Sequence, residues 1–323
     1  MATLIVLALM TGCATAFAET PAAGWTTEIV PRFATVEEGQ QLMRERTLYH
    51  EQINEKTLAF LLQQKGGTLE EYIDYSAEQV LEFTPADEQR IRDALEWLHQ
   101  ALENHGLQLP DPGVITFVKS TGYEANEATA YTSEGNIFLS EIMFDPEVFD
   151  DDFFCENLMH EISHCLSRMF PEYRKTLYSL IHFTVLDEDI DIPQVIWKQI
   201  IANPDVEHHN STAVFTINGE KRECYLVYLT DDVFEKEGDN FFKNGYTGIV
   251  PVGTTEIYRI VEVKDFWDVL GRNTYYVDDP EEAMADNFSY ALMDLDLGYE
   301  DYMNPEIAEG IIDYLKRGDG AAE

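Results

Sequence analysis

The sequence predicts an α+β fold, and three observations support this. Hydrophobic residues make up 45% of the chain and aromatic residues 12%, which is ample for a packed core and excludes a disordered chain. Apolar residues recur at helical spacing over residues 35–106. Strand-like runs and turn residues then dominate residues 114–144 and 213–263, and further helices are expected on either side of the second run.

The charge balance is strongly acidic. The 323 residues include 61 Asp and Glu against 21 Lys and Arg, which gives a net charge of −40. Nucleic acids and anionic membrane surfaces are therefore poor partners, because both are bound through clustered cationic side chains. Cationic peptides and calcium fit the sign of the charge better. We expect a peptide or protein substrate and no nucleic acid; oligomeric state is not predicted.

Residues 1–18 have the pattern of an export signal. They contain no charged side chain, an apolar run over Leu4–Met10, and Ala16 and Ala18 at the spacing of a signal-peptidase site. An alternative is that Met10–Cys13, which resembles the bacterial lipobox, makes Cys13 a lipid-anchored residue. The sequence therefore predicts an exported bacterial protein, either secreted or a surface lipoprotein. No later segment is long and apolar enough to span a membrane.

The rest of the chain divides into two regions at the break Pro110–Gly113. Residues 19–112 are expected to form a helical N-terminal region, in which Thr84-Pro85 begins the clearest helix and Gly106 ends it. Residues 113–323 are expected to form the second region, which carries a strand-rich insertion over about 205–264.

The most informative segment is His160-Glu161-Ile162-Ser163-His164. The two histidines are one helical turn apart on one face, which is the spacing that two imidazoles need to bind a single zinc ion. Glu161 lies beside them, where it can accept a proton from water. An apolar stripe on the same predicted helix indicates that its other face is buried; the stripe consists of Phe154, Leu158, Ile162, Leu166 and Met169.

A third metal ligand is expected from a later helix that begins at Asp279-Pro280. Ser167 and Phe170 stand where the metzincin extension requires Gly and His, so that class is excluded. Glu282 and Asp286 have the i, i+4 spacing that places them on one helix face. Glu282 can then bind zinc while Asp286 accepts a hydrogen bond from a ligating imidazole. The adjacent Glu281 is a competing ligand.

These motifs resemble those of the gluzincin metallopeptidases, and most closely the group that includes anthrax lethal factor and the Pro-Pro endopeptidases. The resemblance rests on the HExxH motif and on Glu282, Ala285, Asp286 and Phe288 of the later helix. It covers about 160–170 and 275–292. It implies a zincin-like catalytic domain with an active-site helix and a small mixed sheet.

The resemblance also implies a mechanism. Zinc held by His160, His164 and Glu282 would lower the pKa of water to about 7. Glu161 would act as the general base. Tyr275, seven residues before Glu282, would stabilise the oxyanion, with Tyr276 and Tyr290 as weaker candidates.

The strand-like run 137–144 is expected to pair with an extended peptide substrate. Other segments carry weaker predictions. His208-His209 and the acidic run 187–191 are candidate metal-binding groups, the latter for calcium, although an ordinary polar turn explains each of them better. Cys155 and Cys165 are too far apart on one helix to form a disulfide, and either a bridge to Cys224 or three free thiols remains open.

The sequence therefore predicts an exported zinc metallopeptidase. Two alternatives stay open. One is a surface binding protein that keeps the metallopeptidase fold without turnover, and the other is a zinc amidase that acts on cell-wall peptides.

Overall fold

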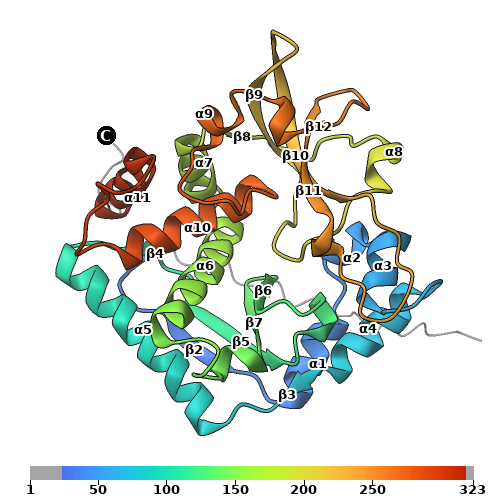
Figure 1. Ribbon diagram of the computed structural model, residues 1–323. Helices are drawn as coiled ribbons and strands as arrows, with labels where there is room; N and C mark the ends of the chain where they lie inside the picture. The colour runs from blue at the N-terminus through green and yellow to red at the C-terminus, as the bar shows by residue number, and fades with distance from the viewer. Residues whose placement is uncertain (1–23, 318–323) are drawn as a thin grey trace, which may run out of the picture.

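The computed structural model describes residues 24–317 and has a mixed α+β architecture (Figure 1). The predicted signal segment 1–18 and Cys13 lie outside the described residues. Across residues 24–317, no helix is both long and apolar enough to cross a bilayer.

One sheet is mixed and has the strand order β2-β5-β7-β6, with β3 added to the end of β5. Strands β2 and β7 both pair with β5 in parallel, whereas β6 pairs with β7 as an antiparallel hairpin. Its strands are β2 (Val30–Phe33), β3 (Val80–Leu81), β5 (Val114–Ser120), β6 (Ala130–Ser133) and β7 (Asn136–Ser140).

The other large sheet is antiparallel and forms the upper part of the molecule in Figure 1. Its order is β12-β11-β10-β9-β8, and it contains the insertion that the sequence predicts. Its strands are β8 (Thr184–Val185), β9 (Ser211–Ile217), β10 (Glu220–Thr230), β11 (Gly245–Pro251) and β12 (Tyr258–Arg259). A separate pair consists of β1 (Trp25–Thr26) and β4 (Leu109–Pro110).

The N-terminal helices pack beside and below the mixed sheet (Figure 1). They are α1 (Val36–Arg44), α2 (Leu48–Gln52), α3 (Glu55–Leu61), α4 (Leu69–Glu78) and α5 (Pro85–His105). Thr84 caps α5 and Gly106 ends it in the left-handed conformation, as the sequence predicts. The region is not purely helical, because β2 and β3 belong to the mixed sheet.

The C-terminal half contributes the remaining α-helices of residues 24–317. They are α6 (Asp151–Met169), α7 (Pro171–Leu180), α8 (Gln194–Trp197), α9 (Phe266–Leu270), α10 (Pro280–Met293) and α11 (Pro305–Arg317). Helix α6 packs on β6, β7 and α10. One hydrophobic core extends from Ile29 to Leu315 and joins α5, the mixed sheet, α6, α10 and α11.

The strand prediction for 137–144 needs a correction. Strand β7 ends at Ser140, and residues Glu141–Phe144 form a 3-10 helix. Because β7 is paired with β5 on one side and β6 on the other, it has no free edge for a peptide. The edge strand next to α6 is β6, in which the backbone N–H of Thr132 donates a hydrogen bond to Asp205.

Candidate metal centre

Helices α6 and α10 position the residues of the candidate metal centre. Asp150 caps the start of α6, and its side chain accepts a hydrogen bond from the Phe153 backbone N–H. Asp279 caps α10 in the same way, with Pro280 in the first turn. The two helices pack together, so that His160 and His164 on α6 face Glu282 on α10.

Three donor atoms converge on one point. His160 Nε2 lies 3.0 Å from His164 Nε2 and 3.1 Å from Glu282 Oε2, and the third side of the triangle, from His164 Nε2 to Glu282 Oε2, measures 3.4 Å. Neighbouring ligands of a tetrahedral zinc ion are separated by about 3.3 Å, given metal–ligand bonds of about 2.0–2.1 Å. A single proton can bridge only one of these three pairs, whereas one metal ion can bind all three atoms.

The other ring nitrogens fix the orientation of both histidines. His160 Nδ1 lies 2.8 Å from Asp286 Oδ1, and His164 Nδ1 lies 3.0 Å from Glu281 Oε1. Carboxylates at these positions favour protonated Nδ1 atoms that donate hydrogen bonds. The lone pairs of both Nε2 atoms are then directed at the shared point, as in metal sites with carboxylate–histidine pairs.

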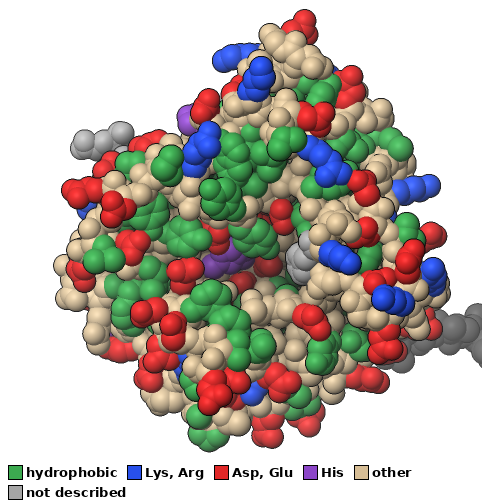
Figure 2. Space-filling model, viewed as in Figure 1, with side chains coloured by type: hydrophobic (Ala, Val, Ile, Leu, Met, Phe, Trp, Pro, Cys, Tyr) green, Lys and Arg blue, Asp and Glu red, His purple; other side chains and the backbone are tan. Residues whose placement is uncertain are grey.

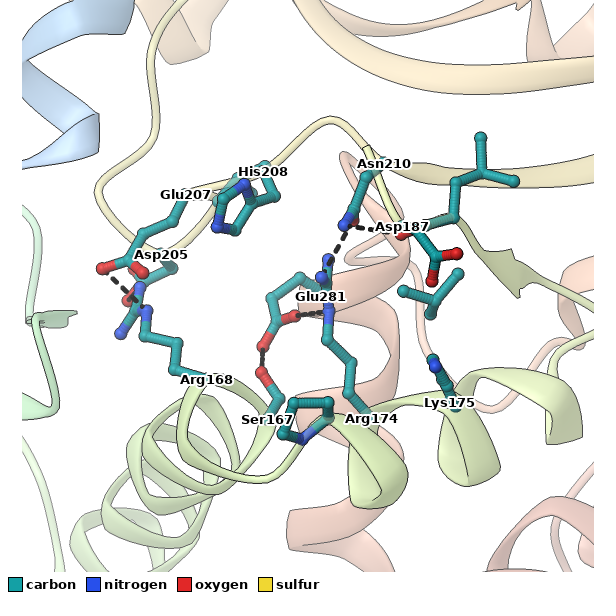
Figure 3. A pocket seen from close by; sticks show the side chains of 14 residues that line it. Ser167, Arg168, Arg174, Lys175, Asp187, Asp205, Glu207, His208, Asn210 and Glu281 are labelled. Atoms are coloured by element: carbon teal, nitrogen blue, oxygen red, sulfur yellow. Dashed lines mark hydrogen bonds and ion pairs between the residues drawn. The ribbon is translucent and has the colours of Figure 1, made fainter. Parts of the chain in front are cut away.

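The carboxylates around the histidines also have partners of their own. Glu281 is buried and accepts hydrogen bonds from Ser167 and Tyr178, and Arg174 Nε lies 3.4 Å from its Oε2 (Figure 3). Figure 3 looks into a 280 Å³ cavity that Ser167, Arg174 and Glu281 help to line.

Asp286 accepts a hydrogen bond from Thr274, and Glu282 accepts one from Asn203. Glu281, Glu282 and Asp286 are thus each held by polar groups besides the histidines.

These contacts shift the pKa values of the cluster in consistent directions. Burial lowers the pKa of His160, but its hydrogen bonds to Asp286 and Glu282 outweigh burial and raise it to about 10. Burial raises the pKa of Glu281, but the hydrogen bond to His164 and the charge of Arg174 lower it to about 2. Glu281 is therefore ionised at neutral pH, and a metal ion that binds His160 must displace the proton that the raised pKa of this imidazole retains.

Glu161 is distinct from the other acidic residues of the cluster. It is only 4% exposed, yet its Oε2 atom has no hydrogen-bond partner among the described residues. Burial, assisted by the charge of Asp205, raises the pKa of its carboxyl to about 8. A buried carboxylate oxygen without a partner is costly unless a ligand or water reaches it. This unpartnered oxygen, together with the donor triangle, fits a catalytic zinc ion.

The cluster lines a 390 Å³ pocket, and Figure 2 shows histidine side chains at the floor of a hollow in the centre of this face. The structure does not bring Tyr275 to this pocket: its side chain is 86% exposed and its ring packs on Trp267. Tyr276 lines the pocket instead, and its ring stacks on His160 at 6.0 Å between centroids. Tyr290 lies behind Asp286, with its hydroxyl 3.4 Å from Asp286 Oδ2.

Comparison with known proteins identifies no relative. No protein family model matches the chain, and no curated protein or solved structure is similar enough to count as a match.

The sequence did not predict the roles of three residues of the site. Glu281 appeared only as a competitor of Glu282, but it binds the opposite nitrogen of His164. Asn203 and Asp205 come from the loop between α8 and β9, and no local pattern marks them. Asp205 is buried and accepts hydrogen bonds from the backbone and hydroxyl of Thr132 at 2.7 and 2.6 Å.

The weaker metal candidates lie elsewhere. Among residues 24–317, the groups that could hold a metal ion are His160 with His164 and Glu282, and Glu161 with His164 and Asp205. Neither group includes the acidic run 187–191 or the His208-His209 pair. His208 Nδ1 instead lies 3.1 Å from Asp189. Cys155, Cys165 and Cys224 are free thiols.

Proposed function

We propose that this protein is a zinc metallopeptidase with a zincin-like catalytic domain. The observation that carries the proposal is the donor triangle of His160, His164 and Glu282 beside the unpartnered carboxylate oxygen of Glu161. The triangle fits one zinc ion, and Glu161 stands where a general base is needed. A zinc ion bound there would supply Lewis acidity, which polarises a carbonyl group and lowers the pKa of water to about 7.

The chain's own residues would carry the proton transfers of peptide hydrolysis. Glu161 would accept a proton from the attacking water as the bond from oxygen to the carbonyl carbon forms. It would then donate that proton to the amide nitrogen as the carbon–nitrogen bond breaks.

Two further features support a peptide substrate. Tyr276 lines the pocket, where its hydroxyl could donate a hydrogen bond to the developing oxyanion. Strand β6 is an edge strand, and Ala130 at its start lines the same pocket. An extended peptide could therefore pair with the start of β6 at Ala130 while its scissile bond reaches Glu161, since Asp205 already binds the backbone N–H of Thr132 further along the strand.

A binding protein on the same fold would need the metal ligands but not Glu161. The buried, unpartnered oxygen of Glu161 therefore favours turnover over binding alone. A zinc amidase would use the same residues and would differ in its substrate. Export, as a secreted protein or a lipoprotein, remains a proposal from residues 1–18.

The direct test replaces Glu161 with glutamine in purified residues 19–323. We expect Glu161→Gln to keep its zinc and its fold but to lower kcat for peptide cleavage by at least about 100-fold. Glu147→Gln is the matched control, because Glu147 is exposed and does not line the pocket. Cleavage by Glu161→Gln at the wild-type rate would contradict the mechanism, and cleavage of muramyl peptides alone would favour the amidase.

A further inference from the structure

The pocket beside His160 is rich in carboxylates, and His160 is the one basic side chain among the described residues that line it. No Lys or Arg belongs to its lining, whereas its acidic residues are Glu127, Glu156, Glu161, Asp205, Glu282 and Asp286. A bound zinc ion would offset two of these negative charges. The remainder must be stabilised by hydrogen bonds or by a ligand.

Glu156 is the partly buried member of this set that the metal centre does not use. Glu282 belongs to the donor triangle, Asp286 binds His160, and Asp205 binds Thr132. The carboxylate of Glu156 has no hydrogen bond or ion pair within residues 24–317. Burial and the charges of Asp286 and Asp294 raise its pKa, whereas the charge of His160 lowers it.

The position of Glu156 on α6 places it next to the reacting groups. It precedes His160 by one helical turn and therefore lies on the same face of α6 as both histidines. Phe153 is one turn further towards the start of α6, is 40% exposed, and lines the same pocket. A free carboxylate beside an accessible aromatic ring suits the charge and the alkyl stem of a lysine or arginine side chain.

An independent observation indicates that this pocket receives a ligand. Glu161 lies within it at 4% exposure and presents an oxygen that no protein group contacts. The lack of a partner for this oxygen is a matter of geometry and does not depend on the charge of the other residues that line the pocket. Glu156 therefore lines a pocket in which a second carboxylate, that of Glu161, also has no hydrogen-bond partner among the described residues.

We propose that Glu156 is a specificity-determining residue that binds a lysine or arginine side chain close to the scissile bond. This inference rests on the proposed peptidase function and names its substrate class. A basic side chain would form a charge-assisted hydrogen bond with Glu156 and restore charge balance in the pocket. A glutamate at the same substrate position would add a further negative charge and be rejected.

The test compares peptides that differ only at the residues flanking the scissile bond, which are Lys, Arg, Gln or Glu. We expect wild-type kcat/KM to be at least about 10-fold higher for Lys or Arg than for Gln, and lower again for Glu. Glu156→Gln should abolish this preference, and Glu156→Lys should shift it towards Glu. Glu147→Gln should retain the wild-type order. Equal kcat/KM for all four peptides, or an unchanged order in Glu156→Gln, would overturn the inference.

A binding measurement separates this inference from the proposed function. The zinc-loaded Glu161→Gln protein is titrated into fluorescein-labelled Lys and Gln peptides, and anisotropy gives the dissociation constants. Tighter binding of the Lys peptide, lost in the Glu156→Gln, Glu161→Gln double variant, supports the role of Glu156 even if the wild-type protein cleaves nothing. Equal binding of both peptides overturns it.

Discussion

Glu281 and Glu282 are adjacent in α10, yet their carboxylates contact different nitrogens of the same imidazole. Glu281 Oε1 lies 3.0 Å from His164 Nδ1, while Glu282 Oε2 lies 3.4 Å from His164 Nε2. His164 is fully buried between them. Glu281 therefore orients the imidazole ring of His164, and Glu282 lies beside Nε2, where the proposed zinc ion would bind.

Glu281 and Asp286, the two carboxylates that orient the histidines, are predicted to have similar effects on metal binding. Glu281→Gln and Asp286→Asn should each weaken zinc affinity about 10- to 100-fold, because a neutral amide holds the imidazole less firmly than a carboxylate. Competition with a zinc-binding dye measures the affinity. The exposed Glu309→Gln is the control. Unchanged affinity in both variants would show that these hydrogen bonds do not support the metal centre.

The two tyrosines before α10 make a second prediction. Tyr276→Phe should lower kcat for peptide cleavage by about 10- to 100-fold, since it removes a hydroxyl from the pocket. Tyr275→Phe should leave kcat unchanged, because Tyr275 is 86% exposed and packs on Trp267. Steady-state kinetics of both variants on one peptide checks this. The opposite ranking would restore the role that sequence resemblance implies for Tyr275.

The sequence predicted the parts of the site that depend on helical spacing. His160, Glu161 and His164 share one helix, and the i, i+4 spacing of Glu282 and Asp286 places both near the histidines. The N-cap and end of α5 were also predictable, because Thr84-Pro85 and Gly106 act locally. Such features follow from short-range backbone geometry and need no knowledge of the tertiary fold.

The features that the sequence did not predict depend on tertiary contacts or on irregular backbone. Tyr275 and Tyr276 lie in a non-helical segment before α10, where adjacent side chains diverge and spacing does not decide which one faces the pocket. Asn203 reaches Glu282 from a loop 79 residues away in the chain. β6 is an edge strand because of the way the strands of the mixed sheet pair. The periodicity of apolar residues in the sequence does not show which strands pair.

His50 provides a prediction for the pH dependence of stability. Burial, with a contribution from Arg46, lowers the pKa of His50 to about 4, and its Nδ1 accepts a hydrogen bond from the Thr47 backbone. In the unfolded chain the pKa of His50 is about 6.5, so this imidazole binds a proton more readily there than in the folded protein. This contribution to stability is complete above pH 6.5 and is lost as the pH falls towards 4.

Removing His50 should flatten the stability profile over that range. The wild-type protein should lose up to about 3 kcal/mol more than His50→Gln between pH 7 and pH 4. Urea unfolding at intervals of half a pH unit measures the difference. His105→Gln is the control, because His105 lies at the exposed end of α5 and pairs with Asp296. A His50→Gln profile parallel to that of the wild type would contradict the burial of a neutral His50.

The most direct measurement is the zinc content of purified residues 19–323, determined by elemental mass spectrometry beside Glu282→Ala and the exposed control Glu309→Ala. The donor triangle predicts about one zinc ion per chain in the wild type and in Glu309→Ala, with most of it lost from folded Glu282→Ala. A folded wild-type chain that takes up no zinc even after incubation with the metal would contradict the metal centre and the peptidase function built on it.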